Sequence, residues 1–353
     1  MGINLNNMGI SKTLWDRCRA IELKRRTAQT DKNAVGTKKN LVFILTDRCN
    51  FSCRHCFRSP DRKDDLDLAL AKRIIKESHR FGFRHVAITG GEPLLYPHLP
   101  ELLEDICANH NTFSIVSNGS LFAEYLDTLK TYRRNMSYIA FSLESSDPCQ
   151  HDHVRQKGSY EKLIEAFSHC RRAKIPFRIV TAVSTANFEQ LFDIALLSRK
   201  QGAQRLILST ILPCPHAQDN QYVLDPQQRN ELFLTSAALS KIAGIPIGIA
   251  ADIRTSDPIR MCVPLNFNEI TVNAKGEMVQ CCELANFDNE DIRRFSFVCS
   301  LKDRTFAQAL EICSHRLSDL EQSRIKDLQN AKDPNHVDAN SCFYCVHKLG
   351  AKG

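Results

Sequence analysis

The chain has 353 residues, of which 43% are hydrophobic and 25% are charged, and its formal net charge is +7. These values are ordinary for a globular protein with room for one large domain and a smaller one. No run of 18 or more apolar residues occurs, so neither a membrane-spanning helix nor a membrane partner is expected. The modest charge favours a scattered solvated surface over a dedicated site for an anionic partner, and nucleic acid is not expected to bind.

Cysteine is the residue type whose use stands out. Fifteen cysteines occur, and residues 1–12 lack the positive start and apolar block of a signal peptide, which predicts a cytoplasmic location. In a reducing compartment thiols do not persist as a disulfide framework. A clustered excess of thiols therefore indicates metal or redox chemistry.

Residues 1–40 form a polar, basic N-terminal extension. Trp15, Cys18 and Ile21 lie at helical spacing, which predicts a short amphipathic helix. The run Lys24-Arg25-Arg26 is compatible with contact to nucleic acid or a peptide. A solvated, charged helix end is the preferred interpretation.

From residue 41 to about residue 258, short β-branched or aromatic runs alternate with amphipathic helical segments. This alternation predicts βα units and a parallel sheet, and six units suit an open, partial (β/α)6 barrel similar to a TIM barrel. Ligands of such folds sit at the carboxyl ends of the strands, where most polar motifs of this chain also fall. The predicted strands are 41–46, His85–Thr89, Phe113–Ser117, Tyr138–Leu143, Phe177–Val183 and Leu206–Leu212.

The pattern changes near residue 258, after a predicted helix at Leu224–Ala243 and the apolar run Ile245–Ala250. Residues 269–281 predict a β-hairpin with a glycine-containing turn, and a further helix is expected around Thr305–Leu317. We expect a second, smaller domain at about 259–353.

The first cysteine motif follows the first predicted strand. Cys49, Cys53 and Cys56 place three thiolates within eight residues. Such a set can hold one corner of an iron–sulfur cube and leaves the fourth iron without a protein ligand. Zinc or structural thiols are the alternative, but zinc usually takes four ligands in paired Cys-x2-Cys units.

The Cys-x3-Cys-x2-Cys motif after a strand resembles the radical S-adenosylmethionine (SAM) superfamily. The resemblance implies a [4Fe–4S] cluster on these three cysteines, with SAM bound to its open iron. The residue before the third cysteine is usually aromatic in this family and lies near the adenine; here it is His55. A second match, Thr89-Gly90-Gly91-Glu92-Pro93, resembles the Gly-Gly-Glu-Pro motif that receives the SAM amino group. An ammonium group needs acceptors, and glycines allow close backbone approach.

Further matches to the family follow the later strands in the expected order. Ser117-Asn118-Gly119 ends the third predicted strand, and Ser142 and Glu144 end the fourth, where the family commonly meets the SAM ribose. Arg155, in His151-Asp152-His153-Val154-Arg155, is the candidate partner of the SAM carboxylate because its planar fork suits that group. A His-Asp-His metal site is an alternative for this stretch, and ordinary loop residues are preferred. Asn187, after the fifth strand, is a further candidate for cofactor contact.

A third cysteine set lies in the expected C-terminal domain. Cys262, Cys281 and the pair Cys342 and Cys345 resemble the "twitch" domain, a shortened SPASM domain that holds one auxiliary [4Fe–4S] cluster. Cys282 is the alternative to Cys281, and a zinc ribbon is the alternative to the cluster. Four protein ligands leave a cluster closed, which limits it to electron transfer or structural support.

The resemblance implies reductive cleavage of SAM to methionine and a 5′-deoxyadenosyl radical, which abstracts a substrate hydrogen atom. Electron removal by the auxiliary cluster gives oxidation or cross-linking, whereas a hydrogen atom returned by Cys214 gives epimerisation. We expect an oxidoreductase or epimerase that acts on a peptide or on a small molecule such as a sugar or aminoglycoside. Flavodoxin or ferredoxin is the expected electron donor. The alternatives are an RNA-modifying radical enzyme and a non-catalytic zinc-binding interaction protein.

Overall fold

A computed structural model describes most of the chain. The described residues are 39–58, 61–219, 221–250, 264, 268–285, 287, 289–330 and 341–350. The predicted N-terminal helix around Trp15 and the candidate ligand Cys262 lie outside these residues.

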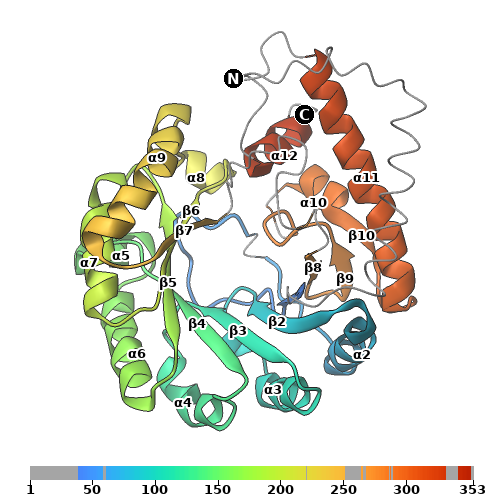
Figure 1. The fold of residues 1–353 in the computed structure, drawn as a ribbon, viewed down its shortest axis with the longest axis horizontal. Helices are drawn as coiled ribbons and strands as arrows, with labels where there is room; N and C mark the ends of the chain where they lie inside the picture. Colours follow the sequence, from blue (N-terminus) through green and yellow to red (C-terminus); the bar gives the residue numbers. More distant parts are fainter. Residues whose placement is uncertain are drawn as a thin grey trace.

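A single curved sheet organises the described part of the chain (Figure 1). Its strand order is β10-β9-β8-β1-β2-β3-β4-β5-β6-β7, and β1 to β7 run parallel to one another. The expected parallel partial barrel is therefore confirmed. The seven parallel strands are β1 (Lys39–Ile44), β2 (Phe83–Thr89), β3 (Thr112–Ser117), β4 (Met136–Ser142), β5 (Phe177–Val183), β6 (Leu206–Thr210) and β7 (Ile247–Ala250).

Helices follow the strands and cover the outer, convex face of the sheet (Figure 1). The sequence determines where several of them begin. Asp67 caps α2, and Asp225 forms a capping box with Gln228 at the start of α9. The helices of this region are α2 (Leu68–Ser78), α3 (Leu99–Ala108), α4 (Phe122–Thr131), α5 (Pro148–Val154), α6 (Ser159–Ala173), α7 (Leu191–Lys200), α8 (Pro215–Asp219) and α9 (Pro226–Ala243).

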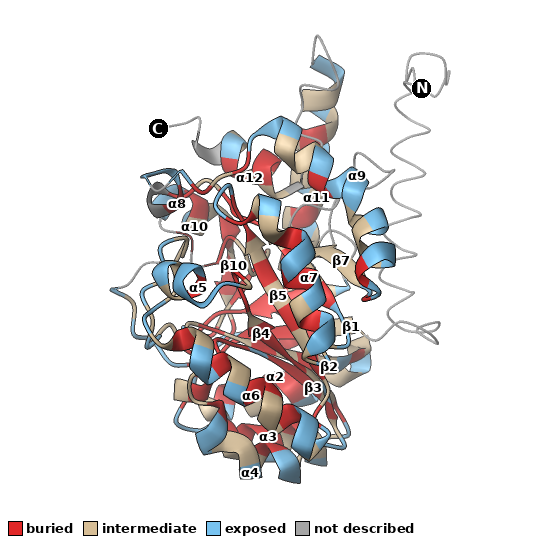
Figure 2. Cartoon of the chain, turned by 90° about the vertical axis from the view of Figure 1, so that its left-hand side faces the viewer, coloured by how far each residue is buried: buried red, intermediate tan, exposed pale blue. Residues whose placement is uncertain are grey.

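The main apolar core lies between the sheet and these helices. Strand β5 alternates between buried and half-buried residues, and its buried Phe177, Ile179 and Val183 belong to this core. The period of two places these buried side chains on the face of the sheet that the helices cover and the half-buried ones on the opposite face. Figure 2 shows the buried strands behind helices α6, α7 and α9, whose outward sides are exposed.

The end of β6 and the presence of β7 differ from the sequence-based expectation. Strand β6 ends at Thr210, and Ile211 and Leu212 leave the sheet to pack in a second apolar cluster. The following Pro213 favours an extended connection at this point. The apolar run at 245–250, which was not assigned, forms a seventh parallel strand beside β6.

The C-terminal elements extend the same sheet. The predicted hairpin is confirmed as β8 (Glu269–Val272) and β9 (Glu277–Val279), with Gly276 at φ +79° in the turn. Strand β8 also pairs in parallel with β1, so the sheet continues across the predicted domain boundary at residue 259. The remaining elements are α10 (Glu290–Ser296), β10 (Phe297–Ser300), α11 (Phe306–Asn330) and α12 (Ser341–Gly350).

A second apolar cluster joins the end of β6 to the C-terminal elements; we call it the junction cluster. Its buried members are Ile211, Leu212, Cys214, Ala217, Tyr222, Leu284, Phe287, Ile292, Phe343 and Val346. Within the described ranges, no helix combines the length and the apolar content that a membrane span requires.

Candidate functional site

The loop that carries the first three cysteines begins where β1 ends and is held by the neighbouring β2 turn. Leu45 N–H donates to Thr89 O, Gly91 N–H to Thr46 O, and Glu92 N–H to Arg48 O, at 2.7–2.9 Å. The two glycines make this approach possible. A Cβ on Gly90 would lie 2.6 Å from Thr46 O, and one on Gly91 would lie 2.2 Å from Arg48 O.

We expect Gly91→Ala to disrupt this backbone contact, because a methyl group cannot occupy a position 2.2 Å from a backbone oxygen. The strand-end turn must move, at a cost of about 3 kcal/mol in unfolding free energy. Denaturant unfolding of the full chain measures the loss. Gly248→Ala is the matched control, since its nearest neighbour would be a side-chain atom 3.8 Å away. Equal stabilities of the two variants would contradict the expectation.

The three thiols of this loop differ in exposure. Cys49 is exposed, whereas Cys53 and Cys56 are half-buried. Burial raises the pKa of Cys49, and it raises that of Cys53 to about 11, while the nearby Arg155 guanidinium acts in the opposite direction. The Cys49 and Cys53 thiols are therefore protonated at neutral pH when no metal is bound, and a metal that binds them must displace protons.

Single-ion metal sites are absent from the described residues, where no group of three or more His, Cys, Asp or Glu side chains is arranged to hold one ion. In a zinc site the ligands converge on one ion. The thiols of an iron–sulfur cluster bind different irons and need no such convergence. The all-thiol donor set is the one that such clusters prefer.

Glu92 braces the ends of β2 and β3. Its buried carboxylate accepts hydrogen bonds from Ser117 Oγ (2.8 Å) and from the backbone N–H groups of Leu94 (3.1 Å) and Asn118 (2.7 Å). Burial raises its pKa, and these hydrogen bonds oppose the rise. The carboxylate is thus fully engaged within the protein, and Pro93 follows it at the first position of a 3-10 turn.

The side chain of Asn118 extends this brace to the cysteine loop. It donates to Asn50 Oδ1 at 2.9 Å, while Asn50 donates to Ser120 Oγ at 2.8 Å. Asn50 and Ser120 help to hold the cysteine loop in place, and the sequence analysis did not predict either of them. The only signal was the position of Asn50 beside Cys49.

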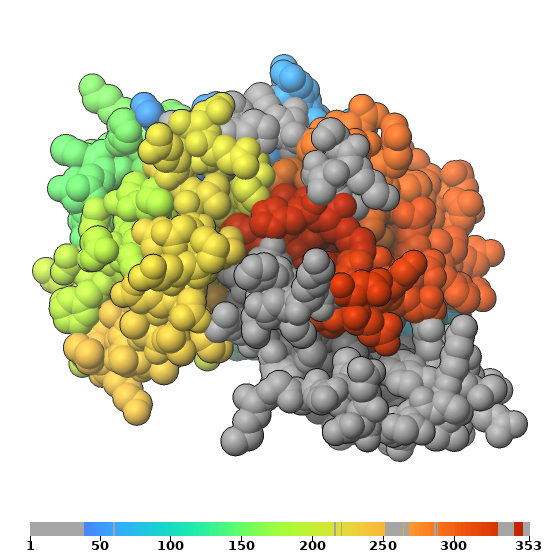
Figure 3. Space-filling view, turned by 90° about the horizontal axis from the view of Figure 1, so that it is seen from above, coloured from blue at the N-terminus to red at the C-terminus, as the bar shows by residue number. Residues whose placement is uncertain are grey.

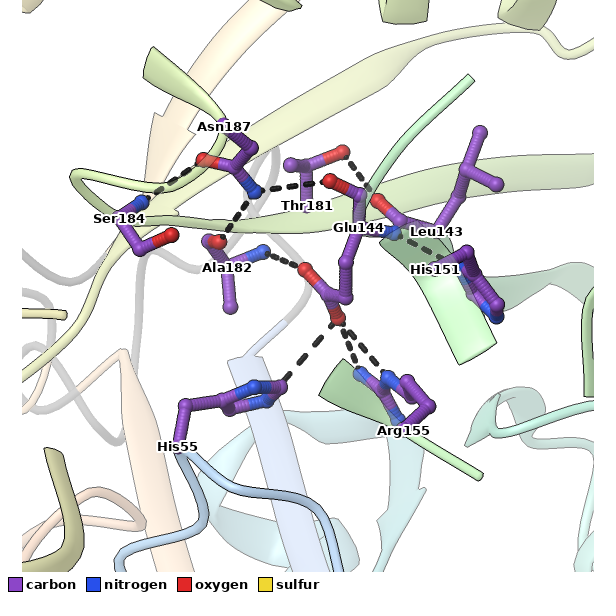
Figure 4. A network of polar contacts seen from close by, with 9 residues as sticks. All are labelled: His55, Leu143, Glu144, His151, Arg155, Thr181, Ala182, Ser184 and Asn187. Carbon is purple, nitrogen blue, oxygen red and sulfur yellow. Dashed lines mark hydrogen bonds and ion pairs between the residues drawn. The ribbon is translucent and has the colours of Figure 1, made fainter. Parts of the chain in front are cut away.

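Glu144 is the centre of a second network, formed by the ends of β4 and β5 (Figure 4). Arg155 donates to Glu144 Oε1 from Nε at 2.9 Å and from Nη2 at 2.5 Å. Ala182 N–H donates to the other carboxylate oxygen at 2.8 Å. Both oxygens of a side chain that is 1% exposed are therefore used inside the protein.

The Glu144–Arg155 pair is a buried ion pair. Burial alone would raise the pKa of Glu144, but the charge and hydrogen bonds of Arg155 and the smaller effects of other nearby groups together hold that pKa below its usual value. Arg155, whose pKa is raised by the surrounding anions despite burial, stays charged. The predicted contacts of these two residues with SAM stay predictions, and in this structure the arginine fork faces Glu144.

Two other predicted residues support this network. Asn187 donates to Glu144 O at 2.9 Å and to Ala182 O at 3.0 Å, and it accepts from Ser184 N–H at 2.8 Å. It therefore fixes the backbone between the two strand ends. Ser142, the last residue of β4, is half-buried.

The His-Asp-His stretch has structural partners. His151 Nδ1 accepts from Glu144 N–H at 3.1 Å. Asp152 accepts from Gly158 N–H, Ser159 Oγ and Tyr160 N–H at the start of α6. These bonds use one ring nitrogen of His151 and both carboxylate oxygens of Asp152.

His55 differs from these engaged residues. Its Nε2 lies 4.0 Å from Glu144 Oε1, and its buried Nδ1 has no hydrogen-bond partner among the described residues (Figure 4). Burial lowers its pKa to about 4, so the ring is neutral at pH 7. A buried ring nitrogen without a partner marks a position where a bound ligand can supply one.

The third cysteine set gathers at the junction cluster. Cys281, Cys342 and Cys345 are half-buried and pack against it, although Cys281 lies more than 60 residues before the other two. Cys282 does not belong to that cluster; its thiol lies 3.9 Å from Glu269 Oε1 and 4.0 Å from Glu283 Oε1. Burial, with Glu283 nearby, raises the pKa of Glu269 to about 7.

Cys214 lies between the two cysteine sets. It is fully buried in the junction cluster, and its Sγ is 3.9 Å from the carbonyl oxygen of Cys56. On the loop side, Phe57 stacks on Phe287 with ring centroids 6.0 Å apart. The cysteine loop thus packs directly against the C-terminal elements.

Comparison with known proteins identifies the family. Residues 43–197 match the model of the radical SAM superfamily, a range that contains the three-cysteine loop, the Gly-Gly-Glu-Pro turn and the Glu144 network. This part of the chain is a radical SAM domain. Among curated relatives of this radical SAM protein, AlbA, the antilisterial bacteriocin subtilosin biosynthesis protein of Bacillus subtilis, is 30% identical over 167 residues. That match covers 46% of this chain and 37% of AlbA.

Two GTP 3′,8-cyclases are also similar. That of Syntrophomonas wolfei is 30% identical over 167 residues, which cover 44% of this chain and 50% of the relative. A probable one from Methanococcus maripaludis is 23% identical over 286 residues, with 75% and 95% covered. The match thus spans half or less of the first two relatives and nearly all of the third.

Solved structures share the fold. Streptococcus suis SuiB bound to S-adenosylmethionine superposes with a TM-score of 0.63 at 13% identity, covering 85% of this chain and 71% of SuiB. Native anSMEcpe with bound AdoMet and Kp18Cys peptide gives a TM-score of 0.63 at 14% identity, with 83% and 86% covered. At these identities the likeness establishes the fold alone, the partial barrel already described.

Proposed function

We propose that this radical SAM enzyme abstracts a hydrogen atom from a bound substrate and completes an oxidation or a cross-link. The observation that carries the proposal is the convergence of three elements at one end of the sheet. The Cys49/Cys53/Cys56 loop is hydrogen-bonded to the turn at Gly90 and Gly91, and His55 of this loop lies 4.0 Å from Glu144, the centre of the second network.

The residues present fit a SAM-binding [4Fe–4S] cluster. Three thiols form its donor set, and the unpartnered Nδ1 of His55 lies beside them. When bound, the cluster and SAM supply the electron and the radical that start the reaction. Thr89 to Pro93 form the turn proposed to receive the SAM amino group, with Ser142 near the ribose.

The chain's own polar residues act mainly by holding the loops and charged groups of the site in place. Glu92, with Ser117 and Asn118, holds the β2 turn and the cysteine loop in register. Glu144, with Arg155 and Asn187, keeps charged groups in place before any ligand arrives. Groups that are fixed in advance lose little entropy when a ligand binds.

An auxiliary [4Fe–4S] cluster is proposed at the junction cluster. Cys281, Cys342 and Cys345 are its ligands there, and Cys262 is the proposed fourth. Its place against the cysteine loop suits an electron acceptor for the substrate radical, which is what oxidation or cross-linking requires. The carboxylates of Glu269 and Glu283 beside the Cys282 thiol favour Cys281 as the ligand.

A peptide is the first substrate to test. SuiB has been solved with the precursor peptide SuiA and anSMEcpe with a peptide, and AlbA is a bacteriocin biosynthesis protein. GTP belongs in the same assay, because the alignment with the Methanococcus maripaludis protein covers 95% of that relative. A sugar-type alcohol remains the third candidate class.

The proposal is tested by anaerobic reconstitution of the full chain with iron and sulfide. We expect about eight irons and eight sulfides per chain and SAM-dependent release of 5′-deoxyadenosine after reduction. A reduced flavodoxin or ferredoxin is the electron donor to try first. Zinc without sulfide, or clusters that do not cleave SAM, would contradict the proposal.

Epimerisation is the second candidate outcome, and the contact between Cys214 and the Cys56 carbonyl favours it. A thiol there can give a hydrogen atom to a substrate radical, and the external donor then restores the thiol with an electron and a proton. In that case Cys214→Ala should abolish product formation, and in heavy water the product should gain one deuterium. An oxidised product is two hydrogens lighter instead. Full turnover by Cys214→Ala would eliminate the epimerase version.

A further inference from the structure

We infer that two arginine–aromatic stacks hold helix α12 from two directions and fix the direction in which Cys342 and Cys345 face. Arg229 and Arg324 are, on this reading, positioning residues for the auxiliary site. The inference rests on the proposed function, which assigns these cysteines to a cluster. The new element is how the fold orients the Cys342 and Cys345 side chains.

On α12 the two thiols and the two residues between them lie on different faces of the helix. Successive residues of a helix turn by about 100°, so Cys342 and Cys345, three apart, share one face. The two intervening residues, Phe343 and Tyr344, point to the two flanks behind that face. Both are buried, with 1% and 6% of their surface exposed.

The first stack connects α12 to the barrel. The guanidinium of Arg229, on α9, lies over the ring of Phe343 at 3.8 Å from its centroid. Phe343 also belongs to the junction cluster, together with Val346 one turn along the helix. This flank of α12 is therefore anchored to the last helix of the barrel.

The second stack connects α12 to α11. The guanidinium of Arg324, which is 2% exposed, lies 4.2 Å from the centroid of the Tyr344 ring. Tyr344 Oη donates to Asp327 at 2.5 Å, and Lys348 donates to the same carboxylate. An arginine is rarely buried unless its charge is matched, and an aromatic face provides such a match.

The two stacks act on one short helix from two directions. Seen from above, the atoms of α12 lie between those of the α8–α9 region and those of α11 (Figure 3). A rotation of α12 that turned the thiols away from the junction cluster would break both stacks. Metal sites need ligands that are locked in direction by such surrounding contacts.

The experiment isolates the auxiliary site by replacing Cys49, Cys53 and Cys56 with alanine in the full chain. Arg229→Met and Arg324→Met are then compared after reconstitution, since methionine keeps an apolar stem but removes the charged plane. We expect each variant to retain at most half the iron of its parent after exposure to a chelator, and the double variant less. Arg178→Met is the matched control, because Arg178 stacks on Tyr138 at 3.7 Å within the barrel. It should retain all the iron.

A second measurement uses the unloaded chain and does not depend on a cluster. The alkylation rates of Cys342 and Cys345, followed by mass spectrometry, should rise at least threefold in the two arginine variants and stay unchanged in Arg178→Met. Arg324→Lys keeps the charge but loses the planar stack, so it should recover part of the protection. Circular dichroism verifies that each variant is folded.

Folded arginine variants that keep both their iron and the parental alkylation rates would overturn the inference. Failure of the proposed function would give a different experimental result. The cysteine-to-alanine parent would then hold no iron and sulfide although both arginines are intact. The alkylation rates would still decide whether the stacks position α12.

Discussion

Replacing Cys53 by alanine should abolish SAM cleavage and lower the iron content from about eight to about four per chain. The thiol belongs to a three-residue donor set, and two thiols cannot hold a cluster that keeps one iron open for SAM. The nearby Glu144 carboxylate is held by Arg155 and is not available to replace the thiol. 5′-Deoxyadenosine release and iron analysis measure the two effects.

Two comparisons make this result specific. Cys149→Ala, on the exposed surface of α5, should leave both quantities unchanged. Cys345→Ala should also lower the iron content to about four but should keep SAM cleavage, because it removes a ligand of the other proposed cluster. Retention of iron and cleavage by Cys53→Ala would contradict the assignment of the first loop.

Replacing Glu144 by glutamine should destabilise the folded chain by about 3 kcal/mol. The carboxylate accepts from Arg155 on one oxygen and from Ala182 N–H on the other. A glutamine amide has only one oxygen, so its NH2 group must face one of these donors. Arg155 would also stay buried without its opposite charge.

Denaturant unfolding of the full chain measures this loss, and a double-mutant cycle with Arg155→Gln separates the pair from its surroundings. The double variant should lose less than the sum of the two single losses. Glu290→Gln is the control, because its ion pair with Arg294 is 75% exposed on both sides and should contribute less than about 0.5 kcal/mol. Additive losses at Glu144 and Arg155 would mean that the buried pair is not coupled.

The two variants probe different parts of the same site. Cys53 tests which atoms hold a cofactor, and Glu144 tests what keeps the strand ends in place around it. Gly91 belongs to the contact between these two parts of the site, because its backbone hydrogen bond to Thr46 holds the β2 turn against the cysteine loop. A site of this kind is assembled by packing before any ligand binds.

The sequence by itself determined the fold class and the location of the cysteine loop. Alternating apolar periods predicted the strands, as in β5, where the predicted bounds are those observed. Close spacing in the chain makes Cys49, Cys53 and Cys56 neighbours in almost any fold. Such features depend on residues a few positions apart, and local geometry therefore reveals them.

Only the tertiary structure decided which partners the polar residues take. The Arg155 guanidinium can pair with any carboxylate, and in this fold it pairs with that of Glu144, 11 residues away in sequence. Cys214 meets the Cys56 carbonyl across 158 residues, and β8 pairs with β1 across more than 200. Contacts at such separations arise from how the sheet curves and how helices pack on it, and no local pattern records them. The same reason explains why the arginine stacks that flank α12 were not visible in the sequence.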